Sequence, residues 1–549
     1  MENTQNIIAV GYDYGSTTSL LESFNKDSQS FCEIARCCSE WTQGHQYIPS
    51  PKRLLSQSNI ETTDAGEPLA SVELHIPVGN VISDFTHSLI QKSCQEFQDH
   101  KIHLTLTVPD SYTNFECSLM LKSICRAFKN YLRDQFDSTQ DVVILPEPVA
   151  AALYYTYINL NNFTHGHKDL LICDIGGGTT DLAIVRAKVE IDKLQTQTQT
   201  CRYNLSFNVL ATAGNPQLGG NDITKVLVKK MSQFYNLETY ISNSKWFWDN
   251  CEKLKIELSY KKGDEDSVVI YVEDNNGKPF QKDGQDFYIS CNRKDLETWI
   301  IEEYKENNGL GNKLRDCINE VKRVATRKIK ELNLITETHD VPGINFNTIT
   351  IVPVGGSMRM PLFRKTLEKE MGARTSMADI NDDGIFDCVS RGAALYSAHE
   401  TGQLSLINRL NLENRTPYSI SVGHGENSVK ECIPRNAVAG VYDVTLYPLN
   451  VDCIKKTFVL TELNFYQSAH EARDIKQVKF FGTLKLDSKT EFEVSDCSPE
   501  KKELRLRFEI DKNIRRVGVR LEIENVRLLG SDNFELFRYP RDGYYYFNF

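Results

Sequence analysis

Apolar and polar positions follow two different periods along this chain, and the change of period divides it into two parts. Up to about residue 400, short apolar runs alternate with segments in which apolar residues recur every three or four positions. The first pattern is typical of strands and the second of helices. In one helical segment, residues 114–134, the apolar stripe consists of Leu121, Ile124, Cys125, Phe128 and Leu132. We therefore expect an α/β domain over residues 1–400.

In the remainder of the chain, apolar residues take every second position. Two such runs extend from Leu504 to Ile510 and from Val517 to Ile523. A period of two is typical of half-buried antiparallel strands. Further strand candidates lie at residues 416–422, 444–447 and 480–486. These runs predict a compact β-domain.

A glycine-rich turn follows an apolar run that starts at residue 171. Its glycines are Gly176, Gly177 and Gly178, and Asp174 and Asp181 flank them. Consecutive glycines let backbone N–H groups converge on an anion, and the flanking carboxylates can hold a Mg²⁺ ion through its waters. The segment therefore predicts a turn that binds the phosphates of ATP.

Two further glycine clusters follow apolar runs. Residues 7–10 precede Asp13, Gly15 and a group of hydroxyls, and residues 349–354 precede Gly355 and Gly356. A bare turn or bulge explains any single cluster about half the time, which is the usual risk of reading motifs. The three together, in this order, favour a clamp around one nucleotide.

With these motifs the chain resembles the heat-shock protein 70 (Hsp70) chaperones, members of the actin-like ATPase superfamily. The resemblance covers nearly the whole chain. Other stretches that carry it lie at residues 107–109, 145–153, 211–222, 251–259, 391–394, 415–422, 433–436 and 465–467. It implies a two-lobed α/β actin-like ATPase domain over 1–400, a linker over 401–413, an antiparallel β-sandwich that holds client peptides over 414–530, and an aromatic tail over 531–549.

The resemblance also implies roles for individual residues. Asp13 and Asp174 would order the waters of Mg²⁺, while Glu147 and Asp181 would orient the attacking water. Thr179, with Ser16 and Thr17, would contact phosphates. Further nucleotide contacts would come from Gly15, Gly176, Gly177, Gly178, Gly219, Gly220, Glu252, Lys255, Ser259, Gly355, Gly356, Ser357 and Arg359.

Two of these carboxyl groups, and the lysine at position 52, have simpler alternatives. Asp13 is otherwise a turn aspartate that caps its own backbone, and Glu147 is otherwise a surface loop acid. Lys52 resembles the family's catalytic lysine, which neutralises charge on the γ-phosphate. Residues 47–50, however, also resemble an earlier strand of the family, and in that alignment Lys52 is a solvated charge. Both alignments stay open.

Several positions depart from the family pattern. Ile256 stands where the family has an arginine against the base, so only Arg359 remains there and we expect weaker nucleotide binding. Phe386 stands at a position that is acidic in the family. Cys117 replaces an arginine that relays the nucleotide state, and polar residues interrupt the linker, so we expect weaker coupling between domains. Gly425 replaces a bulky residue over the peptide. We expect no helical lid after the β-domain, and we expect the aromatic tail that ends at Phe549 to pack on that domain.

Composition and charge limit the partners and the cellular compartment that we expect for this chain. The 549 residues are 40% hydrophobic and carry a net charge of -11, which disfavours nucleic acid as a partner. The 15 cysteines contain no C-x-x-C pair, so we expect reduced thiols. Without a membrane segment or a signal peptide in the sequence, we expect a cytoplasmic monomer.

Three functions remain open at this point. The first is a lidless, divergent Hsp70-like chaperone that hydrolyses Mg-ATP slowly, binds extended or unfolded peptide segments and works with co-chaperones. The second is a scaffold or exchange-type co-chaperone that holds ATP without hydrolysing it, with the β-domain as a docking module. The third is an actin-like filament former, which leaves the β-domain unexplained.

Overall fold

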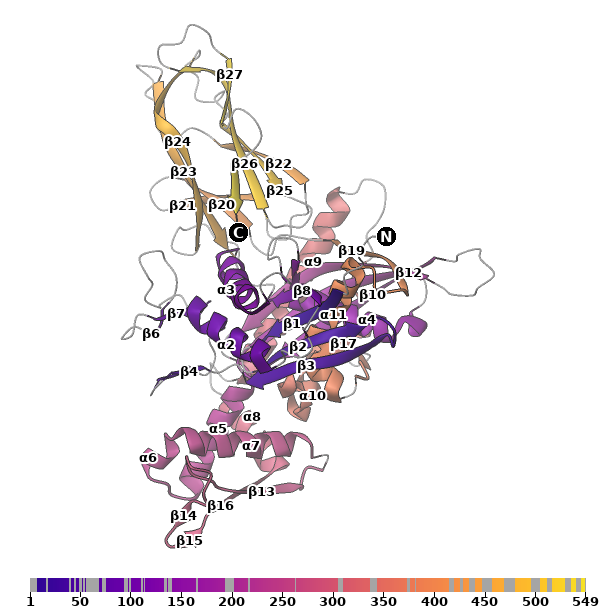
Figure 1. Cartoon of the computed structure of the whole chain (residues 1–549), viewed down its shortest axis with the longest axis vertical. Coiled ribbons are helices and arrows are strands. Elements are labelled where there is room, and N and C mark those ends of the chain that lie inside the picture. The colour runs from indigo at the N-terminus through magenta and orange to yellow at the C-terminus, as the bar shows by residue number, and fades with distance from the viewer. Residues whose placement is uncertain are drawn as a thin grey trace. The chain divides into compact units, whose positions relative to one another are not determined.

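The structure is a computed structural model, shown in Figure 1. It divides into two compact units, Met1–Pro109 with Ser123–Asn411, and Asp110–Lys122 with Leu412–Phe549. It describes residues 7–15, 18–38, 41–43, 46–48, 52, 55, 69–71, 76–92, 97, 100–109, 112, 114–132, 136, 141–163, 166–192, 202–215, 218–261, 263–304, 310–335, 343–372, 376–380, 382–413, 419–424, 428–433, 440–446, 457–468, 479–494, 504–510, 516–528, 535–539 and 545–548.

A five-stranded mixed sheet forms the first half of unit one. Its order is β3 (Ser30–Cys38), β2 (Thr18–Asn25), β1 (Ile7–Tyr14), β8 (Lys101–Val108) and β9 (Val142–Pro146). The strands β1, β2 and β3 pair antiparallel, whereas β1, β8 and β9 pair parallel. Asp13 therefore lies near the end of the central strand, just before the β1–β2 turn.

A second mixed sheet repeats this plan. Its order is β18 (Ser376–Met377), β17 (Thr350–Val354), β10 (Gly166–Ile175), β11 (Thr180–Asp192), β12 (Arg202–Asn215) and β19 (Ile407–Glu413). Again three consecutive strands, β10 to β12, pair antiparallel, and β10, β17 and β18 pair parallel. Asp174 lies just before the β10–β11 turn, as Asp13 does before the β1–β2 turn. The two mixed sheets with their helices are compatible with the expected two-lobed actin-like domain.

Long helices pack on these sheets, and glycines allow the closest approach. Helix α11 (Asp382–Glu400) packs against β1 and against α4 (Glu147–Ile158). A Cβ atom on Gly392 would lie 1.9 Å from the carbonyl oxygen of Ala150, so only glycine fits there. Three further helices are α2 (Val78–Lys92), α3 (Asn114–Leu132), which forms residues 114–132 of the predicted 114–134 segment, and α9 (Leu310–Ile335), which packs on β11 and β12.

A smaller lobe of unit one is built from the chain between β12 and α9. Its main helices are α5 (Gly220–Phe234), α7 (Lys245–Ser259) and α8 (Arg293–Tyr304), with the short α6 (Thr239–Ser242) before α7. The hairpin of β13 (Ser267–Tyr271) and β16 (Tyr288–Asn292) packs on α7. The remaining elements of the unit are β4 (Trp41–Gln43), β5 (Gln46–Ile48), β6 (Leu69–Ser71), β7 (Ile76–Pro77), η2 (Leu160–Asn162), β14 (Gln281–Lys282), β15 (Gln285–Asp286), η3 (Phe346–Thr348), η4 (Gly356–Arg359) and α10 (Pro361–Met371).

The predicted linker is not a loose connection in its described part. The strand β19 lies beside β12 at the edge of the second sheet, and Leu404 and Ile407 are buried. The N–H of Tyr203 donates to the carbonyl oxygen of Leu406 at 2.9 Å. The division between the two units falls between Asn411 and Leu412, inside this strand.

The second unit contains one antiparallel sheet. Its path is β21 (Ser428–Ile433), β20 (Ser419–His424), β23 (Thr457–Ser468), β24 (Lys479–Val494), β26 (Arg516–Leu528), β25 (Leu504–Ile510) and β22 (Gly440–Leu446). Leu506, Phe508, Val519 and Leu521 are buried, as their period of two predicts. The β-sandwich itself stays a prediction, and residues 416–418, Gly425, residues 434–436, Tyr447 and Phe549 lie outside the described residues.

The C-terminal segment predicted as a tail adds two strands to this sheet. Both β27 (Glu535–Tyr539) and β28 (Tyr545–Asn548) pair antiparallel with β26. Among the described residues, no helix is long and apolar enough to cross a membrane. The nine cysteines whose side chains the structure describes form no disulfide with one another, and most of them are buried.

Candidate functional site

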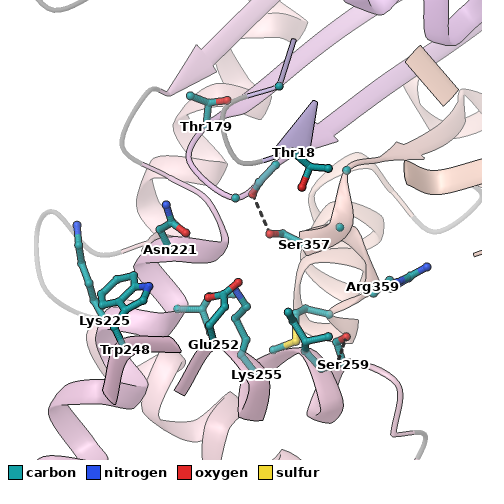
Figure 2. Close-up of a pocket in the computed structure, with 18 of the residues that line it drawn as sticks. Thr18, Thr179, Asn221, Lys225, Trp248, Glu252, Lys255, Ser259, Ser357 and Arg359 are labelled. Carbon is teal, nitrogen blue, oxygen red and sulfur yellow. Dashed lines mark hydrogen bonds and ion pairs between the residues drawn. The ribbon is translucent and has the colours of Figure 1, made fainter. Parts of the chain in front are cut away.

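A cavity of about 1440 Å³ lies within unit one, between residues from both mixed sheets and the smaller lobe. Part of it is shown in Figure 2. Most of the sequence-predicted site residues line it. They are Asp13, Gly15, Lys52, Glu147, Asp174, Gly176, Gly177, Thr179, Asp181, Glu252, Lys255, Ser259, Gly355, Gly356, Ser357 and Arg359. Gly178, Gly219 and Gly220 are described but are not among its lining residues, and Ser16 and Thr17 lie outside the described residues.

One end of the cavity holds a buried cluster of charged side chains. The ammonium of Lys52 donates to Glu147 Oε1 at 2.6 Å, and the two residues are only 6% and 7% exposed. Lys52 is therefore not the solvated charge of the alternative alignment, and Glu147 is not a surface loop acid. Asp13 accepts a hydrogen bond from Thr107 Oγ1 at 3.3 Å, so it is more than a self-capping turn residue.

Burial and mutual repulsion change the protonation of this cluster. Burial raises the pKa of Asp13 to about 7, with Lys52 opposing the shift and Glu147 adding to it. Burial, followed by Glu147, Asp181 and Asp13, raises the pKa of Asp174 well above its usual value. Burial alone would lower the pKa of Lys52, but Glu147 and Asp13 outweigh it and raise that pKa. Ionising all the carboxyl groups of the cluster is therefore unfavourable unless an additional cation is present.

The glycine turn is held by two neighbouring elements. The N–H of Gly176 donates to the carbonyl oxygen of Thr179 at 3.0 Å and closes the turn. The carbonyl oxygen of Gly176 accepts from the N–H of Gly220 at 3.0 Å and from Ser357 Oγ at 2.8 Å, the bond dashed in Figure 2. The first turn of α5 and η4 therefore fix the position of the turn.

Glycine at position 219 permits this close approach of α5. A Cβ atom there would lie 2.8 Å from the carbonyl carbon and oxygen of Gly177. The neighbouring N–H of Asn221 donates to the carbonyl oxygen of Gly177 at 2.6 Å. In the described structure Gly219 thus packs against the turn, and its predicted contact with a nucleotide stays a prediction.

Helix α7 contributes a compact polar group to the cavity wall. Lys255 Nζ donates to Glu252 Oε1 at 2.6 Å and to Thr224 Oγ1 and the carbonyl oxygen of Gly220 at 3.2 Å each. Thr224 Oγ1 also donates to Glu252. Burial lowers the pKa of Lys255, although Glu252 opposes the shift. Figure 2 shows the carboxylate of Glu252 beside the ammonium of Lys255. Thr224 was missed by the sequence reading, although its place one helical turn after Gly220 is a usable signal.

Arg359 lies at another part of the wall, between aromatic side chains. Its guanidinium carbon is 4.2 Å from the ring centroid of Phe386 and 4.7 Å from that of Tyr260. Arg359 Nη1 also donates a hydrogen bond to Tyr260 Oη. Ile256, which is 44% exposed, lines the same cavity. Phe386 was noted as a departure from the family pattern, whereas Tyr260 belongs to no motif and was missed.

Arg36 is a cation on the cavity wall that no motif signals. It lies on β3 and pairs with Asp387 at 2.6 Å. Asp387 also pairs with Arg391 at 2.7 Å, and Arg391 pairs with the buried Glu22 at 3.1 Å. Burial raises the pKa of Glu22 to about 7, and Arg391 opposes the shift. This charge network, Glu22, Arg36, Asp387 and Arg391, joins β2 and β3 to α11.

The cavity wall also includes residues of the smaller lobe that are not among the predicted site residues. Lys225 and Asn221 come from α5 and Trp248 from α7, and Figure 2 shows Lys225 beside Trp248. Among the described residues, no three His, Cys, Asp or Glu side chains are arranged as direct ligands of a metal ion.

Comparison with known proteins adds a family likeness. Residues 140–488 match the family model for Hsp70 protein. The chaperone protein dnaK of Thalassiosira pseudonana is 26% identical over 350 residues, which cover 63% of this chain and 48% of that protein. DnaK of Ureaplasma urealyticum is 24% identical over 383 residues, 67% of this chain and 52% of that protein. A heat shock 70 kDa protein of Neurospora crassa is 26% identical over 302 residues, 53% of this chain and 38% of that protein. The match thus spans about half the length of these relatives or less.

Proposed function

The chain belongs to the Hsp70 family, and on this premise we propose that it is a chaperone that binds Mg-ATP in the cavity of unit one and hydrolyses it slowly. The observation that carries the proposal is the charged cluster of Asp13, Lys52, Glu147 and Asp174 beside the glycine turn. It combines buried and half-buried carboxylates, a lysine and a backbone turn, which are the groups that phosphoryl transfer to water requires.

The carboxylates fit a magnesium ion that is held through its waters. Burial and repulsion hold the pKa values of Asp13 and Asp174 above their usual range, and a nearby divalent cation favours the ionised forms. When bound, Mg²⁺ would supply charge neutralisation between the phosphates. Asp13 and Asp174 would accept hydrogen bonds from its waters, as the family resemblance implies.

The remaining residues of the cluster would act on the phosphate and the attacking water. Thr179 would contact phosphate oxygens from the turn, and the ammonium of Lys52 would stabilise negative charge as it develops. Glu147 and Asp181 would accept hydrogen bonds from the attacking water and so orient it. Glu252, Lys255 and Ser259 of α7 would contact the ribose and base, opposite Gly355, Gly356 and Arg359.

We further propose that the second unit binds extended peptide segments. Its antiparallel strands offer main-chain hydrogen bonds and alternating side-chain pockets, the usual means of holding such segments. Co-chaperone partners, a monomeric state and a cytoplasmic location stay predictions.

A thermal unfolding experiment on the full chain tests nucleotide binding. Mg-ATP at one hundred times its dissociation constant should add about 2.7 kcal/mol to the free energy of unfolding. Mg²⁺ alone and inorganic phosphate serve as controls. An unchanged unfolding temperature at millimolar Mg-ATP would remove the proposal.

Binding of Mg-ATP at neutral pH should also release protons. Asp13, with a pKa of about 7, is about half protonated at pH 7, and a cation nearby lowers that pKa. We therefore expect the apparent affinity for Mg-ATP to rise between pH 6 and pH 8. Calorimetry at pH 7 in buffers of different ionisation enthalpy measures the protons released.

Glu22 provides the matched control for this titration. Burial raises its pKa to about 7 as well, but among the described residues it is not on the cavity wall. Replacing Glu22 with glutamine should leave the number of released protons unchanged. A binding enthalpy that is identical in all buffers would contradict the role given to Asp13.

The ion pair of Lys52 and Glu147 favours one alternative function. The ammonium of Lys52 and the carboxylate of Glu147 lie 2.6 Å apart and so neutralise each other. If this ion pair persists in the complex with ATP, neither group is available for catalysis, and the chain would bind ATP without hydrolysing it. The protein would then serve as an ATP-holding scaffold or exchange-type co-chaperone. Steady-state phosphate release from the pure protein separates the two functions, because only the first produces it.

A further inference from the structure

We infer that Tyr260 lowers the affinity of the site for nucleotides. Its side chain packs on the guanidinium of Arg359 and accepts a hydrogen bond from it, and so competes with the nucleotide base for stacking on this guanidinium. The inference rests on the proposed function, because it assumes that the nucleotide base enters this part of the cavity. It concerns Tyr260 and Arg359 together, since Tyr260 would act through Arg359 and not on the phosphates.

The contact between the two side chains uses both parts of the tyrosine. The ring centroid lies 4.7 Å from the guanidinium carbon, and the hydroxyl accepts a hydrogen bond from Nη1. Tyr260 directly follows α7, and its N–H donates to the carbonyl oxygen of Glu257 at 3.3 Å. Its backbone is therefore held by the helix end, and rotation of its half-exposed side chain would release Arg359.

The other surroundings keep the guanidinium in place. Phe386 packs on it at 4.2 Å, and a Cβ atom on Gly356 would lie 2.7 Å from the Phe386 ring, so the ring is itself closely packed. Ile256, one helical turn before Tyr260, adds an apolar side chain without a charge. A base that stacks on a cation here would therefore use Arg359.

The competition between Tyr260 and the base for Arg359 affects only ligands that carry a base. A purine that stacks on Arg359 must first replace the tyrosine ring and its hydrogen bond, which offsets part of the stacking energy. A bare triphosphate, bound at the charged cluster and the glycine turn, leaves the contact between Tyr260 and Arg359 untouched. The two kinds of ligand thus separate this effect from any general change in the cavity.

The test compares Mg-ATP with magnesium tripolyphosphate by calorimetry on the full chain. Tyr260→Ala should tighten Mg-ATP binding about three- to fivefold, the scale of one exposed cation–π contact, and leave tripolyphosphate binding unchanged. Tyr260→Phe keeps the ring and loses the hydroxyl bond, so it should have a smaller effect in the same direction. Tyr240→Ala is the control, because Tyr240 is 66% exposed on α6 and, among the described residues, is not on the cavity wall.

Each other outcome overturns the inference in a recognisable way. Weaker Mg-ATP binding by Tyr260→Ala would make Tyr260 a stacking wall for the base, and equal binding would leave it without a part in recognition. An equal change for both ligands would indicate a general structural effect. If the unaltered protein binds neither ligand, the proposed function fails, and this inference fails with it.

Discussion

Replacing Asp174 with asparagine should lower steady-state phosphate release from Mg-ATP by about a hundredfold or more. Asp174 lies on β10 opposite Asp181, and its pKa responds to Glu147, Asp181 and Asp13, so its carboxylate is central to the charged cluster. Loss of one preorganised charge that stabilises the transition state commonly has an effect of this size. Asparagine has nearly the same volume, so the packing of β10 should be preserved.

The stability of the nucleotide-free protein should not fall in this variant. Burial and the neighbouring carboxylates already disfavour the ionised form of Asp174, so a neutral amide removes repulsion from the cluster. Urea unfolding without nucleotide measures this directly. Lost turnover together with unchanged stability would separate a catalytic role of Asp174 from a structural one.

A surface aspartate supplies the control for this substitution. Asp283 is exposed on a hairpin turn at φ 55°, a conformation that asparagine also adopts readily. Asp283→Asn should leave phosphate release unchanged. If Asp174→Asn retained the turnover of the unaltered protein, the magnesium role of the cluster would be wrong.

Replacing Gly392 with alanine should destabilise unit one by about 3 kcal/mol, at the upper end of the usual cost of overpacking. The new Cβ atom would lie 1.9 Å from the carbonyl oxygen of Ala150, which is backbone and not a flexible side chain. Alanine is the better helix former by about 1 kcal/mol, but the clash outweighs this gain. Helices α11 and α4 would have to separate.

Urea unfolding followed by circular dichroism measures this loss. Gly343→Ala is the matched control, because a Cβ atom at Gly343 meets nothing within 4 Å. The control should unfold at the same urea concentration as the unaltered protein. An unchanged midpoint for Gly392→Ala would mean that the packing of α11 on α4 is looser than described.

The local pattern of the sequence predicts elements better than it predicts their partners. The period of two anticipates β25 and β26 because it reports burial on one face of each strand, and the helical stripe anticipates α3 for the same reason. The pairing of β19 with β12 joins distant segments, and no local period reports that. For the same reason the sequence did not anticipate that residues 110–122 group with the second unit.

The residues of the candidate site likewise fall into those that a short motif predicts and those that only the fold brings together. Glycine turns and their flanking aspartates are short motifs with a direct chemical reason, so the sequence names them. Lys52 remained between two alignments because its burial depends on Glu147, 95 residues away. Tyr260 contacts Arg359 across 99 residues and belongs to no motif, so only the fold brings the pair together.

The charge network of Glu22, Arg36, Asp387 and Arg391 also limits how this chain can evolve. Loss of Arg391 would leave the buried Glu22 without its cationic partner, a change that commonly costs about 3–5 kcal/mol, a large share of the stability of a typical domain. Substitution of Arg391 alone should therefore be strongly disfavoured. Descendants should keep Glu22 and Arg391 together or exchange both at once, so that β2 and α11 change together.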